Sequence, residues 1–379
     1  MGVGRALALL EPLAGGALVV LVLADVFLTI LYARMGSGIL STRLARAVWG
    51  AFRGVRARRG HGILRYAGPA ILVLLLAMWA FGLVVGTALV IHPALGTSVR
   101  RDAGSTPTGF VTALYAGAEA MAVAGSSDLV PQTSTFRVLF VVDALIGISI
   151  ISLTLTYLMQ IYTALLRRNA LGLTVDVLTS RTGDAAELLR RVAPQGRFDT
   201  GYTILATLAQ DLATSKEAHH FYPVLFYFHF DTPMYSVARF ALVALDAATL
   251  IRTALADDAA WLAESAAVEA MWQSSLLLVG ALADTFSQVV PSDAYADAAE
   301  SRWRARYAAA LCRLRDGGIA TVHDERAGAD RYVALRRCWD RAVTALAPAM
   351  GYDVAETDPA TATAAATVAP AIVRTLAAR

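Results

Sequence analysis

Charged side chains are scarce in this sequence. Only 17% of its 379 residues are charged, 57% are hydrophobic, and Lys216 is the single lysine among 33 basic residues. Soluble domains carry about 25% charged residues, so this composition excludes an ordinary soluble protein of two or three domains. Much of the apolar surface must therefore face lipid.

Motifs of catalysis and metal binding are also missing. The two cysteines, Cys312 and Cys338, stand apart, without C-x-x-C or zinc-ligand spacing. No G-x-G-x-x-G follows a strand pattern, and no P-loop, Ser/His/Asp set or pair of carboxylates stands out as catalytic. We therefore expect neither a nucleotide-binding Rossmann domain nor an enzyme.

One histidine-rich segment has the composition of a metal site: it contains His219, His220 and His229, with Glu217 and Asp231 close by. The same segment is rich in aromatic residues, and packing of those rings explains the histidines better than a metal ion does. We expect no metal site there.

Three apolar segments, at about residues 13–32, 66–91 and 136–165, are long enough to cross a membrane. A spanning helix needs roughly 20 such residues. The first segment is expected to be a retained span rather than a signal peptide, because its apolar run is long and no small-x-small cleavage site follows it. Asp25 interrupts this span, and we expect it to make a buried polar contact rather than to bind an ion.

The distribution of arginines predicts how the chain is oriented across the membrane. Residues 34–65, between the first two spans, contain eight arginines and no acidic residue. The positive-inside rule places this loop in the cytoplasm, with the N-terminus outside and the region after Arg167 inside. Apolar residues recur at helical spacing over 40–55, which favours an amphipathic helix on the inner leaflet; the alternative is a solvated basic linker.

Residues 108–124 are moderately apolar but too short to cross, and an irregular segment follows them over 125–131. Non-helical backbone at membrane depth is tolerated only where protein or a water-filled cavity surrounds it. The pattern therefore predicts a re-entrant loop between the second and third spans.

The sequence of this loop, TALYAGAEAMAVAGSSDLVP from Thr112 to Pro131, resembles the pore helix and selectivity filter of the potassium-channel superfamily. The usual family pattern ends T-T-V-G-Y-G-D-x-x-P. Aligning Asp128 and Pro131 implies an ion-conducting filter made of Val123, Ala124, Gly125, Ser126, Ser127 and Asp128. The resemblance covers residues 66–166 and implies a two-helix pore module.

In this family, a ring of backbone carbonyls from four subunits replaces the water shell of the ion. Here only Gly125 of the filter glycines is retained, Ser126 replaces the aromatic residue, and Val123 replaces the threonine. The resemblance therefore implies a homotetramer that conducts monovalent cations such as K⁺ or Na⁺, and the substitutions predict poor discrimination between the two.

The resemblance assigns support of the filter to Tyr115 and Glu119. Some family members carry a glutamate at the position of Glu119, hydrogen-bonded through the protein to the aspartate after the filter, here Asp128. Such a pair needs a shared proton or a bridging water, because two close carboxylates do not both ionise cheaply. The alternative is that Glu119 faces the outer vestibule.

The third span carries a polar stripe at spacings of three and four residues: Ser149, Ser152, Thr156, Gln160 and Thr163. Such spacings place the side chains on one helical face, and we expect this face to line the pore. Gly147 is placed to act as a hinge, although membrane glycines also serve close packing. Asp143 lies off the stripe and is expected to point toward the pore helix or a neighbour.

After Arg168 the apolar spacing is helical, over about 203–213, 235–255, 261–289, 303–314 and 332–347. The predicted organisation has four parts: 1–65, an N-terminal transmembrane helix and basic linker helix; 66–166, the pore domain; 167–358, an α-helical cytoplasmic domain; and 359–379, an Ala/Thr-rich tail.

The sequence thus predicts an all-α membrane protein with three transmembrane helices, a re-entrant pore helix and filter, and an α-helical cytoplasmic domain. We expect a multi-pass protein of the bacterial inner membrane, whose partners are the lipid bilayer and identical subunits of a homotetramer. Neither nucleic acid, a small-molecule substrate nor a cofactor is expected. The rival interpretation is a non-conducting membrane sensor or scaffold that keeps the pore fold.

Overall fold

The computed structural model describes residues 2–32, 38–122, 128–287 and 293–358. The chain divides into two compact units. Unit 1 combines Met1–Gly50 with Pro69–Tyr162, and unit 2 combines Ala51–Gly68 with Thr163–Arg379. The segment Ala51–Gly68 therefore packs with the C-terminal part of the chain, although it precedes the second apolar helix in the sequence.

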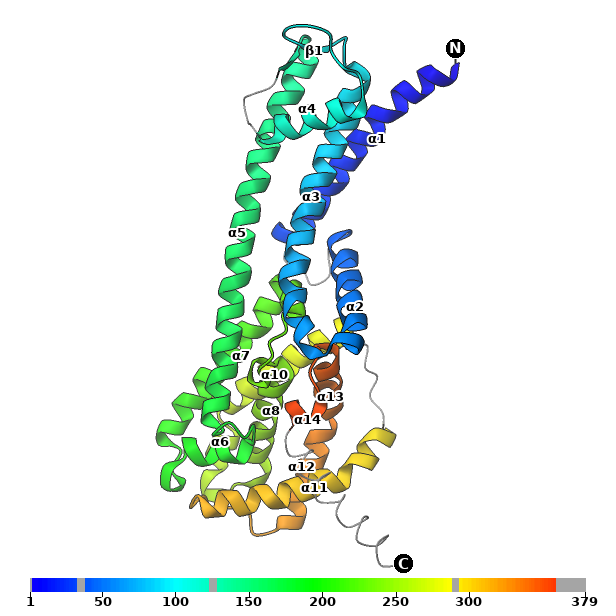
Figure 1. Cartoon of the computed structure of the whole chain (residues 1–379). Helices are drawn as coiled ribbons and strands as arrows, with labels where there is room; N and C mark the ends of the chain where they lie inside the picture. Colours follow the sequence, from blue (N-terminus) through cyan, green and yellow to red (C-terminus); the bar gives the residue numbers. More distant parts are fainter. Residues whose placement is uncertain (1, 33–37, 123–127, 288–292, 359–379) are drawn as a thin grey trace, which may run out of the picture. The chain divides into compact units, whose positions relative to one another are not determined.

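Unit 1 is built from long apolar helices (Figure 1). The absence of charge explains their length: α3 contains no charged residue over 25 residues. The elements, some of which continue into unit 2, are α1 (Gly2–Val26) with the π-helical turn η1 (Phe27–Leu31), α2 (Ser41–Arg59), α3 (Ala67–Ile91), η3 (His92–Ala94), β1 (Val99–Arg101), α4 (Phe110–Ala122), β2 (Leu129–Pro131) and α5 (Ser134–Leu178).

Glycines allow α1 and α3 to approach each other closely. A Cβ atom at Gly86 of α3 would lie 3.0 Å from the carbonyl oxygen of Gly15 in α1. Small residues at such crossings let two helix backbones pack together within a bilayer. The apolar cluster around the crossing consists of Val22, Val26, Leu75, Trp79, Leu83 and Met121.

Among the residues that the structure describes, four helical stretches are long and apolar enough to cross a membrane: Leu10–Leu31, Gly62–Ala94, Ser134–Leu178 and Ala266–Phe286. The first three confirm the predicted apolar helices. The fourth, which includes α10, was not expected as a span, and half of its most apolar window is buried. Its buried side packs against α7 and α8 within unit 2.

Unit 2 is helical and centred on α8 (Val237–Ala254), in which every residue except Arg252 is buried. The surrounding α-helices are α6 (Ala185–Val192), α7 (Asp199–Phe221), α9 (Ala260–Ala263), α10 (Ala266–Leu282), α11 (Asp293–Asp316), α12 (Glu325–Arg337), α13 (Asp340–Ala349) and α14 (Val354–Thr357). The short 3₁₀ or π turns of this unit are η2 (His61–Tyr66), η4 (Pro194–Gly196), η5 (Pro223–Tyr227), η6 (Pro233–Tyr235), η7 (Asp257–Ala259) and η8 (Ala283–Ser287).

Three local expectations need correction. The single helix predicted over 332–347 is two helices, because the chain leaves α12 at Cys338 and starts α13 at Asp340. Helix α6 was not predicted, although its eight residues separate buried apolar side chains from charged ones. The strands β1 and β2 were also missed, because each has only three residues.

Candidate functional site

Helix α4 is held between α3 and α5 by two glycines. A Cβ at Gly117 of α4 would lie 3.0 Å from the carbonyl oxygen of Val84 in α3. A Cβ at Gly147 of α5 would overlap the carbonyl oxygen of Met121, near the end of α4. With 13 residues, α4 is only about 20 Å long, whereas the hydrocarbon core of a bilayer is about 30 Å thick. It is a short helix, about two thirds of the length needed to span the core, packed between two long ones.

After α4 the chain comes back beside strand β1, which precedes α4. Strands β1 and β2 pair antiparallel, with Arg101 opposite Leu129. The backbone N–H of Asp102 donates to the carbonyl oxygen of Asp128 at 2.9 Å. Because β1 precedes α4 and β2 follows it, the segment between them enters and leaves on the same side of unit 1. A re-entrant loop requires such a path, and its insertion into a membrane stays a prediction.

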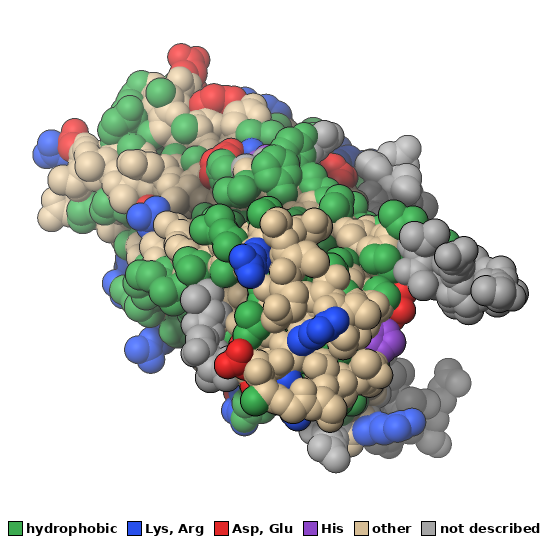
Figure 2. Space-filling view, turned by 90° about the horizontal axis from the view of Figure 1, so that it is seen from above, with side chains coloured by type: hydrophobic (Ala, Val, Ile, Leu, Met, Phe, Trp, Pro, Cys, Tyr) green, Lys and Arg blue, Asp and Glu red, His purple; other side chains and the backbone are tan. Residues whose placement is uncertain are grey.

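Asp128 forms an ion pair with Arg101, with 2.7 Å between Oδ2 and Nε. Both side chains are about half exposed, 51% and 41% respectively, so solvent screens the pair and its contribution to stability is small. The face seen in Figure 2 carries basic and acidic side chains among hydrophobic ones. The exposed charge on this face is therefore mixed in sign.

The remaining predicted filter residues, Val123, Ala124, Gly125, Ser126 and Ser127, lie outside the described residues. Their role stays a prediction. Of the two predicted supporting residues on α4, Tyr115 is 47% exposed and Glu119 is buried. The proposed link between Glu119 and Asp128 likewise stays a prediction.

A second buried carboxylate lies on α5 beside this assembly. Asp143 is 3% exposed, and Thr87 of α3 donates its hydroxyl to Asp143 Oδ1 at 3.4 Å. The Thr87 methyl group lies 3.4 Å from the position of a Cβ at Gly117. Asp143, Thr87 and Gly117 thus join α5, α3 and α4 at one place. Acids within an apolar span are costly and are functional candidates by default.

Helix α5 presents three different faces. Its buried face includes Asp143, Gly147, Tyr157 and Ile161. The predicted polar stripe is exposed along its whole length, at Ser149, Ser152, Thr156, Gln160 and Thr163. An exposed apolar band, suited to lipid, contains Ile148, Ile151, Leu155 and Met159.

The polar stripe lies about a quarter of a turn from the apolar band, at 3.6 residues per turn. The Thr156 hydroxyl donates to the Ser152 carbonyl at 3.0 Å, which satisfies one donor within the helix. Ser149, Ser152 and Gln160 are also exposed on the single chain. In a membrane such a face requires water or a second polar surface.

Asp25 is the best-satisfied polar group within the apolar helices. Its Oδ1 accepts from the backbone N–H groups of Leu40 at 2.7 Å and Ser41 at 3.3 Å. Its Oδ2 accepts from the Ser41 hydroxyl, and from Trp79 Nε1 at 2.8 Å. The carboxylate therefore caps the N-terminus of α2, where the helix dipole favours a negative charge. This agrees with the expected buried polar contact.

A pair that the sequence did not predict joins α1 to the end of α3. His92 Nδ1 lies 2.6 Å from Glu11 Oε1, and the His92 ring meets the Phe110 ring edge to face, with centroids 5.5 Å apart. Because 81 residues separate the pair, no local motif announces it.

The histidine-rich segment of unit 2 is held by packing and backbone contacts. His219 Nδ1 lies 2.8 Å from the Ser215 carbonyl oxygen, and His229 Nδ1 lies 3.3 Å from that of Met350. Among the described residues, no group of three or more His, Cys, Asp or Glu side chains is arranged to hold a metal ion.

Comparison with known proteins places the chain among membrane proteins. It is similar to the uncharacterized membrane protein YdjJ of Bacillus subtilis (strain 168), with 22% identity over 239 residues, which are 63% of this chain and 68% of that protein. No family model matches the chain, and no solved structure matches it significantly. Together with the apolar helices, the similarity supports an all-α membrane protein with transmembrane helices.

Proposed function

We propose that this protein is a homotetrameric ion channel of the potassium-channel superfamily that conducts monovalent cations. The observation that carries the proposal is the re-entrant path of the chain. The β1–β2 pair joins the two ends of the segment that contains α4, and Gly117 and Gly147 seat α4 between two long apolar helices. A short helix of this kind, followed by irregular backbone, is tolerated at membrane depth only inside protein or beside water.

In this proposal the polar stripe of α5 lines the pathway on the inner side of the filter. The stripe is exposed on the single chain, and it is distinct from the apolar band that suits lipid. Four copies arranged around an axis would turn the four stripes toward one another and leave the four apolar bands facing the bilayer. The ions would pass Asp128, the carbonyls of residues 123–127 and then the stripe.

The second candidate function is a non-conducting membrane sensor or scaffold with the same fold. The ion pair between Arg101 and Asp128 favours it. A guanidinium beside the aspartate neutralises the carboxylate that would otherwise attract cations to the outer mouth. Loss of the usual filter residues at Val123 and Ser126 points the same way.

Current through the purified protein in planar bilayers separates the two functions. We expect single-channel currents in symmetrical KCl and, under bi-ionic conditions, a reversal potential that reports similar permeabilities for K⁺ and Na⁺. A permeability ratio near that of strict potassium channels would refute the expected weak selectivity. Protein that inserts but never conducts would favour the sensor or scaffold.

Cysteine substitution tests whether the stripe lines the pathway. In a background with Cys312→Ser and Cys338→Ser, the variants Ser149→Cys, Ser152→Cys and Thr156→Cys should be blocked by charged thiol reagents added from the cytoplasmic side. Ile151→Cys and Leu155→Cys, on the apolar band, are matched controls that should not react, since a thiol away from water stays protonated. Equal reaction of both sets would place the pathway elsewhere.

A further inference from the structure

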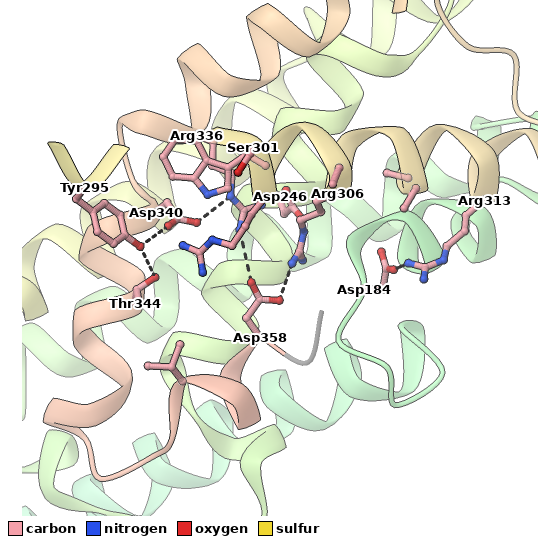
Figure 3. A pocket seen from close by; sticks show the side chains of 16 residues that line it. Asp184, Asp246, Tyr295, Ser301, Arg306, Arg313, Arg336, Asp340, Thr344 and Asp358 are labelled. Carbon is pink, nitrogen blue, oxygen red and sulfur yellow. Dashed lines mark hydrogen bonds and ion pairs between the residues drawn. The ribbon is translucent and has the colours of Figure 1, made fainter. Parts of the chain in front are cut away.

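Unit 2 contains a cavity of about 480 Å³ between α11 and the helices α8, α12 and α13 (Figure 3). Its volume falls within the roughly 300–1,000 Å³ of typical small-molecule sites. Four arginines and four aspartates contribute to its lining: Arg302, Arg306, Arg313 and Arg336 with Asp184, Asp246, Asp340 and Asp358. The aspartates are all paired within the protein, whereas the arginines of α11 keep unused hydrogen-bond donors.

The buried wall of the cavity is an ion network. Arg336, 1% exposed, donates to Asp246 through Nη1 and to Asp340 through Nε, both at 2.8 Å. Arg306 donates to Asp246 at 2.7 Å and to Asp358 at 2.5 Å. Burial favours the neutral form of Asp246, but Arg306 and Arg336 outweigh it and hold the pKa of this carboxyl below its ordinary value. Buried charges are tolerated only when paired in this way.

Each carboxylate of the cavity is already engaged by a donor of the protein. Asp246 also accepts from the Tyr332 hydroxyl, and Asp340 from the Tyr295 hydroxyl at 2.8 Å. Asp184 pairs with Arg313. Figure 3 shows the Tyr295–Asp340 and Asp184–Arg313 pairs at the cavity. The acidic groups therefore have little remaining capacity to attract a cation.

The arginines of α11 have hydrogen-bond donors to spare. Arg302, Arg306 and Arg313 are spaced by four and seven residues, so they share one face of the helix. A guanidinium has five N–H donors, of which Arg306 uses two. Arg302 is exposed, and within the described part of the chain it has no hydrogen bond or ion pair. Between these arginines the helix contributes the buried Trp303 and the small side chains of Ala305, Ala309 and Ala310 to the cavity lining.

We infer that this cavity binds a small organic anion bearing phosphate or carboxylate groups. Arg302 and Arg306 would hold the charged oxygens, because the guanidinium fork matches both phosphate and carboxylate. The less polar part of the ligand would lie over Ala309, Ala310 and Val354. That such a ligand controls conduction is a further step that rests on the proposed channel function, whereas the binding itself does not.

Binding is tested on the full-length protein in detergent, by calorimetric titration and thermal unfolding with pyrophosphate and with citrate. Sodium chloride holds the ionic strength constant. We expect saturable binding and a raised melting temperature with at least one of the two anions. Stronger binding of pyrophosphate would identify a phosphate ligand, and stronger binding of citrate a carboxylate ligand.

Single substitutions distinguish a specific anion-binding site from unspecific attraction of anions to a basic helix. Arg302→Gln should weaken the binding about tenfold, the loss expected for one charge-assisted hydrogen bond. The matched control is Arg304→Gln on the same helix, because Arg304 pairs with Glu300 and Asp330 and lies outside the cavity lining. Ala309→Leu should also weaken binding, since it fills the cavity without changing the charge.

Two results would overturn the inference. One is the absence of a saturable effect of either anion beyond that of sodium chloride. The other is equal weakening by Arg302→Gln and Arg304→Gln, which would indicate unspecific attraction to a basic helix. Neither measurement uses ion currents, so failure of this inference and failure of the proposed channel are told apart.

Discussion

Asp25 shows how a single charged side chain is accommodated in an apolar helix. Its carboxylate is fully buried and connects α1 to the start of α2 and to Trp79 of α3. The same group that interrupts the hydrophobic pattern of the first span therefore joins three helices. It explains why α2 begins at Ser41.

Replacement of Asp25 by alanine should destabilise the protein by about 3 kcal/mol or more, because several buried N–H and O–H donors lose their acceptor and each costs about 1–3 kcal/mol. Asp25→Asn keeps one acceptor oxygen and should destabilise less. Trp79→Phe, which removes a single donor, should have the smallest effect. Melting temperatures in detergent check this order, and an unchanged stability of Asp25→Ala would contradict it.

His219 is a buried histidine whose protonation should oppose folding. Burial, and secondly the charge of Arg168, lower the pKa of His219 from 6.5 to about 4. The unfolded chain therefore binds a proton at higher pH than the folded chain does. The contribution of this group to stability is complete above pH 6.5, decreases as the pH falls toward 4, and is constant below that value.

Thermal unfolding at pH 7 and pH 4 measures the effect. His219→Gln should lose less stability than the unmodified protein on acidification, by at most about 3 kcal/mol, since one pKa unit corresponds to 1.36 kcal/mol. His323→Gln, at an exposed position, is the matched control and should retain the original pH dependence. A parallel response of all three proteins would show that His219 is not the group responsible.

At the scale of elements, the position of the C-terminal end of α4 depends on its close contact with the backbone of α5 at Gly147. Helix α5 runs unbroken from Ser134 to Leu178, and Gly147 lies within it at the carbonyl of Met121. Of the two roles that the sequence left open for Gly147, hinge or close packing, the contact supports close packing.

Gly147→Ala should therefore displace the end of α4 and destabilise the protein by about 1–3 kcal/mol, the range for overpacked sites. In the proposed channel it should also abolish current. Gly16→Ala is the matched control in another long apolar helix, because a Cβ there meets nothing within 4 Å. A Gly147→Ala protein of full stability with altered opening alone would instead support the hinge.

At the scale of the whole molecule, the proposed channel needs several chains, because one chain supplies one α4 segment and one exposed polar stripe. A closed ring of carbonyls requires four such segments, and identical subunits assemble with closed symmetry. In the proposed tetramer the four stripes would face a shared aqueous axis.

We expect native mass measurement in detergent or lipid nanodiscs to report four subunits. Gln160→Leu and Thr156→Val, which remove polar groups from the stripe but keep its volume, should leave the tetramer intact and change its conductance. A monomer that conducts would contradict the pore assignment.

The sequence by itself determined the apolar helices and the class of the protein. Length and lack of charge are local properties, so the helices of the three predicted spans follow from composition along the chain. The helical character of the region after Arg168 is also local. The polar stripe of α5 required only the helical period, which is why its residues are exposed together along one face; its role in lining a pore stays a prediction.

The tertiary structure alone decided which polar groups meet. Trp79 and Asp25 are 54 residues apart, and Arg336 and Asp246 are 90 residues apart. The contact of Gly147 with Met121 and the return of the chain at β1–β2 likewise join distant segments. No periodicity encodes such pairs, because they depend on the path of the chain between them. Buried charged groups are then found in such pairs, because a charge away from water is stable only beside a partner of opposite charge.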